Sequence, residues 1–69
     1  MVTIYGKDNC PYTQAARDDH ARRSVEFAYI NVKKDAAALA RMLEFSHGRR
    51  AVPVIVDDNG LVTIGFGGT

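Results

Sequence analysis

The chain of 69 residues contains a single cysteine, so it cannot form a disulfide within itself. Chains of this length bury only about 60% of their unfolded surface, and many secreted domains of similar size depend on disulfides for stability. The lack of a second cysteine excludes that class of domain. We therefore expect a cytoplasmic protein that is held together by its hydrophobic core alone.

The chain also lacks a large excess of either charge, because nine basic and eight acidic residues leave a net charge of +1. This balance gives no field that would attract nucleic acid or an anionic membrane, and we expect neither as a partner. No apolar run approaches the roughly 18 residues of a membrane-spanning helix, and we expect no leader segment. With 46% apolar residues, residues 1–69 are predicted to form one globular domain.

Hydrophobic patterning predicts alternating strands and helices. The predicted strands are 2–5, 25–32, 54–56 and 61–64, and the first predicted helix is 11–23. A second helix is capped by Asp35, continues through Leu39, Met42, Leu43 and Ser46, and is ended by Gly48. A turn at 57–60 contains Asn-Gly and joins the last two strands as a hairpin. The fold class is therefore α/β, in the order β-α-β-α-β-β, with a four-stranded mixed sheet covered on both faces.

Cys10 lies where the first strand leads into the first helix, and Pro11 suits the first position of that helix. Free N–H groups and the helix dipole at such a position favour a thiolate over a thiol. Lys7 adds positive charge, and the Thr13 hydroxyl is placed to donate to the sulfur. We expect a partly exposed Cys10 with a pKa below the usual value of about 8.5, and hence a nucleophile for thiol–disulfide exchange. The alternative is a buried, inert cysteine.

Three motifs resemble the glutaredoxin family along the whole chain. Cys10-Pro11-Tyr12-Thr13 resembles the Cys-Pro-Tyr-Cys active site, with threonine in place of the second cysteine. Val52-Pro53 before an apolar strand resembles the Val-Pro segment of the family, and Gly65-Phe66 resembles the Gly-Phe of the short glutaredoxin-like redoxins. The resemblance implies a thioredoxin-like fold and a redox-active Cys10.

The resemblance also implies the substrate site. The Val52–Pro53 bond would be cis and close to Cys10, with the backbone of Val52 docking an extended partner. Tyr12 would line the substrate groove together with Gly65 and Phe66. Lys7 and Arg50 would bind a glutathione carboxylate, whereas we interpret Arg49 as surface charge. Glutathione is the implied co-substrate, with no bound cofactor and no metal, and the implied partner is a disulfide-containing protein or a glutathione mixed disulfide.

The chain departs from the family at two places. Because Thr13 replaces the second cysteine, Cys10 has no neighbouring thiol and needs glutathione, the thiol of another protein or a resolving group elsewhere to release it from a mixed disulfide. The glycines and acidic residue that begin the final helix of glutaredoxins, and hold the amino end of glutathione, have no counterpart here. We expect this C-terminal helix to be absent, so that one sheet face exposes apolar strand residues or is covered by a second copy in a weak homodimer.

A more specific resemblance is to the small Uxx-star glutaredoxin-like proteins. It rests on the same Cys-Pro-Tyr-Thr start and on the ending Gly65-Phe66-Gly67-Gly68-Thr69. Members of that family carry a selenocysteine or cysteine two residues before the natural terminus. The resemblance implies that the natural chain continues past Thr69 with such a residue, and the alternative is that Thr69 is the true end.

These observations predict a monothiol thiol–disulfide oxidoreductase in cell redox homeostasis or electron transfer. Two alternatives remain open at this point. One is a module that holds an iron–sulfur cluster between two chains through Cys10 and glutathione. The other is a non-catalytic interaction domain of the same fold. His20 and His47 lack partners at metal-ligand spacing and are not predicted to act in the site.

Overall fold

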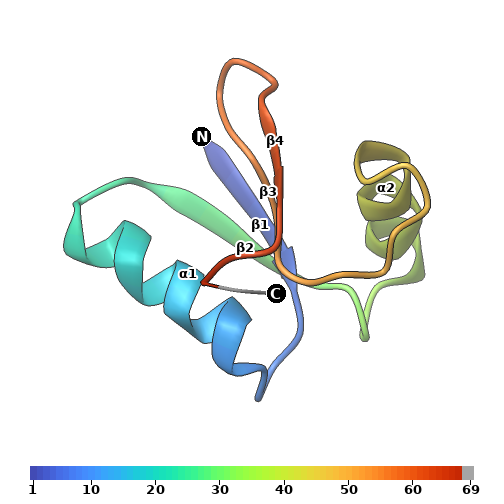
Figure 1. Ribbon diagram of the computed structural model, residues 1–69, viewed down its shortest axis with the longest axis horizontal. Coiled ribbons are helices and arrows are strands. Elements are labelled where there is room, and N and C mark those ends of the chain that lie inside the picture. The colour runs from blue at the N-terminus through green and yellow to red at the C-terminus, as the bar shows by residue number, and fades with distance from the viewer. Residues whose placement is uncertain (68–69) are drawn as a thin grey trace.

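Strands and helices follow one another in the predicted β-α-β-α-β-β order. The computed structural model describes residues 1–67 and places α1 and α2 on opposite sides of a single sheet (Figure 1). The elements are β1 (Val2–Gly6), α1 (Pro11–Arg22), β2 (Phe27–Asn31), α2 (Ala36–Phe45), β3 (Val54–Val56) and β4 (Val62–Ile64). None of the helices in this part of the chain is long and apolar enough to cross a membrane.

The sheet has the strand order β2-β1-β3-β4, so the first strand is central. β1 and β2 are parallel, with Val2 opposite Phe27 and Gly6 opposite Asn31. β3 is antiparallel to both β1 and β4. Because β1 and β2 are parallel, the segments that follow Gly6 and Asn31 leave the sheet at the same edge.

The residues at the start of each helix explain where the helix begins. Cys10 is the N-cap of α1 in extended conformation, and Pro11 follows at a position where its missing N–H costs nothing. The carboxylate of Asp35 caps α2 by accepting a hydrogen bond of 3.0 Å from the backbone N–H of Ala38. Such a cap stabilises a helix by about 1 kcal/mol.

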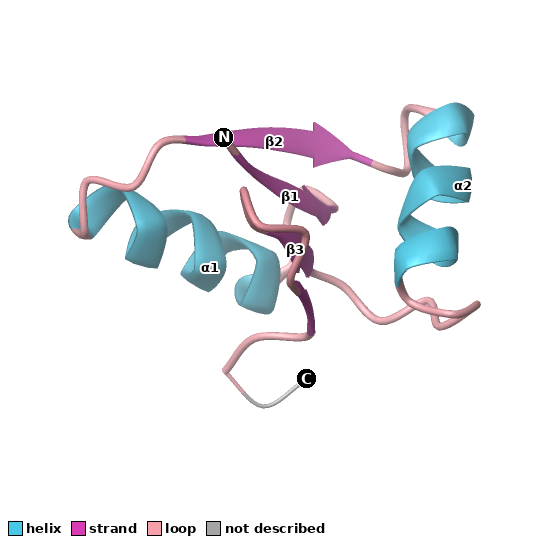
Figure 2. Ribbon diagram, turned by 90° about the horizontal axis from the view of Figure 1, so that it is seen from above, coloured by secondary structure: helices cyan, strands magenta, loops and turns pink. Residues whose placement is uncertain are grey.

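Two apolar clusters lie on the two faces of the sheet, because successive strand residues point to opposite sides. On the α1 face Val2, Ile4 and Ile55 pack with Ala16 of the helix. On the α2 face Tyr5 and Val54 pack with side chains of α2, and Ala38 and Met42 are almost fully buried there. Figure 2 shows the strands lying between the two helices.

Several predicted boundaries shift by one or two residues. β2 is shorter than predicted, because the N–H of Val25 bonds to the carbonyl of His20 and keeps that residue in the turn after α1. The hairpin turn is confirmed, with Gly60 at a φ of +81° and its N–H bonded to the carbonyl of Asp57. Leu61 lies outside β4 and is 66% exposed.

The expectation that apolar strand residues would be exposed is wrong for the part of the chain described. The apolar side chains of β4, Val62 and Ile64, are half-buried on the α2 face, whereas Thr63 is exposed on the opposite side. Phe66 packs against the apolar cluster on the α1 face and covers part of it. The predicted weak homodimer stays a prediction, and Gly68 and Thr69 lie outside the described residues.

Candidate active site

Cys10 lies at the junction of the β1–α1 loop and the first turn of α1. It is 8% exposed, so the expectation of a partly exposed side chain was wrong. The reason is the extended backbone of this N-cap residue, which places Pro11 and Tyr12 on the surface and Cys10 behind them.

The pKa of the Cys10 thiol is lowered despite this burial. Burial itself raises the pKa, but the backbone N–H and the hydroxyl of Thr13, the backbone N–H of Tyr12 and the charge of Lys7 together outweigh it. No acidic residue lies in the first turn of α1 to compete for these N–H groups. The thiolate is thus the favoured anion at this helix N-terminus. This confirms the direction that the sequence predicts.

Thr13 couples the active-site helix to the central strand. Its side chain is 1% exposed, and its hydroxyl accepts a hydrogen bond of 3.5 Å from the backbone N–H of Lys7. A Cβ atom at Gly6 would overlap the Thr13 methyl group and lie 2.7 Å from its oxygen. The close approach of Thr13 to the end of β1 therefore requires glycine at position 6.

Replacing Thr13 by valine should slow alkylation of Cys10 at pH 6 by roughly tenfold, because a hydrogen bond to a charged group contributes about 1.5–3 kcal/mol. Loss of the hydroxyl raises the pKa of Cys10, so a smaller fraction of the protein is thiolate below that pKa. Rates with iodoacetamide measured across pH should converge at high pH, where both proteins are ionised. Thr13→Ser keeps the hydroxyl and is the control; equal rates for all three proteins at pH 6 would contradict the assignment.

The Val52–Pro53 bond is cis, as predicted, and Pro53 is buried. Its carbonyl accepts a hydrogen bond of 2.7 Å from the backbone N–H of Gly65. Gly65 thus ties the segment after β4 to the cis-proline segment. The chain then returns toward the start of α1, where a Cβ atom on Gly67 would lie 3.9 Å from the ring of Tyr12, which is 41% exposed.

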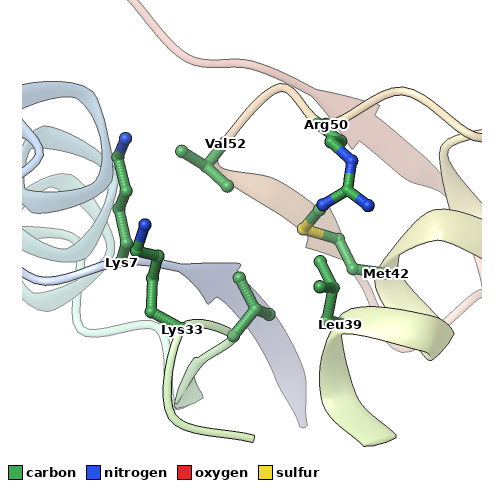
Figure 3. Close-up of a pocket in the computed structure, with 7 residues that line it drawn as sticks. Lys7, Lys33, Leu39, Met42, Arg50 and Val52 are labelled. Carbon is green, nitrogen blue, oxygen red and sulfur yellow. The ribbon is translucent and has the colours of Figure 1, made fainter. Parts of the chain in front are cut away.

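A pocket of about 460 Å³ brings together three of the predicted site residues, Lys7, Arg50 and Val52. The lysines and Arg50 lie on opposite sides of it in the close-up (Figure 3). The other six predicted site residues do not line this pocket: Cys10, Tyr12, Thr13, Pro53, Gly65 and Phe66. Sequence reasoning missed the other residues that line it, which are Val32, Lys33, Leu39 and Met42.

A second group that sequence reasoning missed holds the loop before Cys10. The hydroxyl of Tyr29 donates a hydrogen bond of 2.8 Å to the carboxylate of Asp8, and Lys34 lies 3.7 Å from the same carboxylate. The guanidinium of Arg17 lies 4.0 Å from the centre of the Tyr29 ring. Burial, followed by the Asp8 hydrogen bond, raises the pKa of Tyr29 to about 12, so it remains a donor at neutral pH.

The chain is similar to known proteins both in sequence and in fold. The glutaredoxin family model matches residues 2–62. In structure the chain is similar to the thioredoxin-like protein BC3987, with a TM-score of 0.84, 28% identity and coverage of 97% of this chain and 89% of the other. It is also similar to the glutaredoxin-like protein NrdH-redoxin from Escherichia coli, with a TM-score of 0.80, 30% identity and coverage of 96% and 83%.

A glutaredoxin from Archaeoglobus fulgidus has the same fold, with a TM-score of 0.84, 24% identity and coverage of 96% and 75%. A comparison with curated protein sequences found no significant match. The β-α-β-α-β-β arrangement with two helices and a four-stranded mixed sheet is thus thioredoxin-like, as predicted.

Proposed function

The chain belongs to the glutaredoxin family, and we propose that it is a monothiol thiol–disulfide oxidoreductase in which Cys10 carries the chemistry. The observation that carries the proposal is the lowered pKa of Cys10 at the N-terminus of α1, opposed by burial and produced by Thr13, Tyr12 and Lys7. A thiolate is the nucleophile in disulfide exchange. We also propose that, within the glutaredoxin family, the chain is related to the small Uxx-star proteins.

The first step is attack of the Cys10 thiolate on one sulfur of a disulfide. A bond forms between the Cys10 sulfur and that sulfur, the original S–S bond breaks, and the other half leaves as a thiolate. The backbone of Val52, before the cis Pro53, would hold the partner in extended form beside the site. Tyr12 is exposed at the same end of α1 and would contact that partner.

The second step needs a second thiol, and residues 1–69 contain no cysteine besides Cys10. We propose that glutathione or another protein supplies it. A glutathione or protein thiolate attacks the partner sulfur of the mixed disulfide, forms a new disulfide with it and releases Cys10 as thiolate. When the substrate is a glutathione mixed disulfide, Cys10 holds its glutathione half; one free molecule of glutathione then attacks that sulfur, and the product is one glutathione disulfide per mixed disulfide reduced. A glutathione pool of this kind is cytoplasmic, which is the location that we propose.

Turnover of a glutathione mixed disulfide with glutathione as reductant tests the proposal. We expect rates well above the uncatalysed exchange and a colourless purified protein. The absence of turnover with either glutathione or a dithiol would contradict an oxidoreductase and favour an interaction domain. A brown protein that loses its colour on removal of glutathione would favour the iron–sulfur alternative.

A further inference from the structure

The pocket beside Val52 has three cations that have no acidic partner among residues 1–67. Lys7 follows β1, Lys33 follows β2, and Arg50 precedes the cis-proline segment. In the part of the chain described, Lys34 pairs with Asp8, and both Arg22 and Arg23 pair with Asp19, whereas the three pocket cations, like Arg17, Arg41 and Arg49, form no ion pair. All three are exposed, so their charges are available to an anionic ligand.

Between these cations the pocket is lined by hydrocarbon. Val32 and Met42 are buried core residues that reach its wall, and Leu39 and Val52 are half-buried beside them. Figure 3 shows Lys7 and Lys33 across the pocket from Arg50, Leu39 and Met42. The volume of about 460 Å³ is within the range typical of ligand sites, about 300–1,000 Å³.

Both features are matched by a ligand that carries an apolar side chain beside a carboxylate. Glutathione matches only the charge, because no residue in it has an aliphatic side chain to cover the apolar wall. Lys7 links the pocket to the reaction, since its charge also favours the Cys10 thiolate. Val52 links it to the docking strand, as the residue before the cis Pro53.

We infer that this pocket selects protein disulfides in which an aliphatic residue and an acidic residue lie next to the half-cystine, in preference to glutathione. The inference rests on the proposed function and names its substrate class. Lys7, Lys33 and Arg50 bind the carboxylate, while Leu39, Met42 and Val52 contact the aliphatic side chain. The reaction is the exchange described above, with the peptide sulfur attacked by Cys10.

The test compares short peptides, acetylated and amidated, each linked through its cysteine to 2-mercaptoethanol as a mixed disulfide. The first set has leucine and glutamate next to the cysteine, and its two members carry this pair either on the amino side or on the carboxyl side of the cysteine. The second replaces leucine by serine, the third replaces glutamate by glutamine, and glutathione is the fourth substrate. Quenched mass spectrometry measures the rate constant at which reduced protein acquires each peptide on Cys10.

We expect the leucine–glutamate peptide, in at least one order, to react about tenfold faster than its serine counterpart, since burial of one aliphatic side chain contributes at least about 1.5 kcal/mol. It should also react about two- to fivefold faster than its glutamine counterpart, as exposed ion pairs contribute about 0.2–1 kcal/mol each. Glutathione should react more slowly than this peptide.

The chain offers a matched pair of variants. K33Q/R50Q removes two cations of the pocket, and R41Q/R49Q removes two exposed cations that do not line it, with the same change in net charge. The preference for glutamate over glutamine should disappear in the first variant and persist in the second. Equal rates for all peptides, faster reaction with glutathione, or loss of the glutamate preference in both variants would each overturn the inference.

Bis(2-hydroxyethyl) disulfide, which is neutral and lacks side chains, separates failure of the inference from failure of the proposed function. If Cys10 reacts with it and shows no peptide preference, the exchange activity stands and the inference is overturned. If Cys10 does not react with it, the proposed function fails. The pocket is then tested by NMR titration of the leucine–glutamate peptide with serine in place of cysteine; shifts at Lys33 and Arg50 support it, and unchanged shifts overturn it.

Discussion

Cys10→Ser should leave no measurable acceleration of disulfide reduction, while the protein remains folded. A serine hydroxyl is not ionised near neutral pH, so the attack on sulfur has no nucleophile, and this is the one cysteine of the chain. The fold should tolerate the change, because Cys10 is the N-cap of α1 and serine is a preferred residue there. Turnover of a glutathione mixed disulfide and unfolding in urea measure the two effects.

Cys10→Ala is the matched control for this prediction. It should lose exchange as completely as the serine variant and be less stable by about 1 kcal/mol, the usual difference between serine and alanine at an N-cap. Residual turnover in either variant would show that some other group performs the chemistry. Equal stability of the two would contradict the placement of position 10 as the helix cap.

Gly6→Ala should destabilise the protein by about 2–3 kcal/mol, at the upper end of the usual cost of overpacking a core. A Cβ atom at this position would overlap the methyl group of Thr13, which is almost fully buried and cannot move outward. The clash should also displace the Thr13 hydroxyl and raise the pKa of Cys10 toward that of an ordinary thiol. Urea unfolding and the pH dependence of alkylation measure the two effects.

A double-mutant cycle with Thr13→Ala tests the cause. If the clash with Thr13 is responsible, the double variant should be more stable than the sum of the two single losses requires. Gly60→Ala is a useful comparison, since nothing lies within 4 Å of its added Cβ and its cost comes from a φ of +81° alone. It should leave the alkylation of Cys10 unchanged; additive losses in the cycle would contradict the contact.

The order of the strands and helices could be predicted because the signals for it are local. Pro11 and Asp35 mark helix starts within one turn, and both α1 and α2 begin where they indicate. The turn before β4 depends on Gly60 and the carboxylate of Asp57, which bonds to the N–H groups of Asn59 and Leu61. Contacts of this kind span two to four residues and are visible in the sequence.

The missed parts of the site depend on contacts between distant segments. Asp8 and Tyr29 are 21 residues apart, and nothing near either residue indicates that they bond. From the sequence alone, Lys33 is indistinguishable from other surface lysines, because its position in the pocket depends on the pairing of β2 with β1. Met42 is similarly indistinguishable from other core residues, although it also lines the pocket. The burial of Cys10 was missed for a similar reason, since it depends on how the loop enters α1 rather than on the motif.

The placement of Cys10 at the start of α1 also decides which half of a mixed disulfide departs. In thiol exchange the sulfur with the lower pKa is the better leaving group. The N–H groups and the hydroxyl that favour the Cys10 thiolate therefore direct an incoming thiol to attack the partner sulfur and expel Cys10. In the proposed reaction, this preference favours release of Cys10 by glutathione or another external thiol. For the function that we propose, the mixed disulfide is therefore expected to be the short-lived form and the reduced thiolate the resting form.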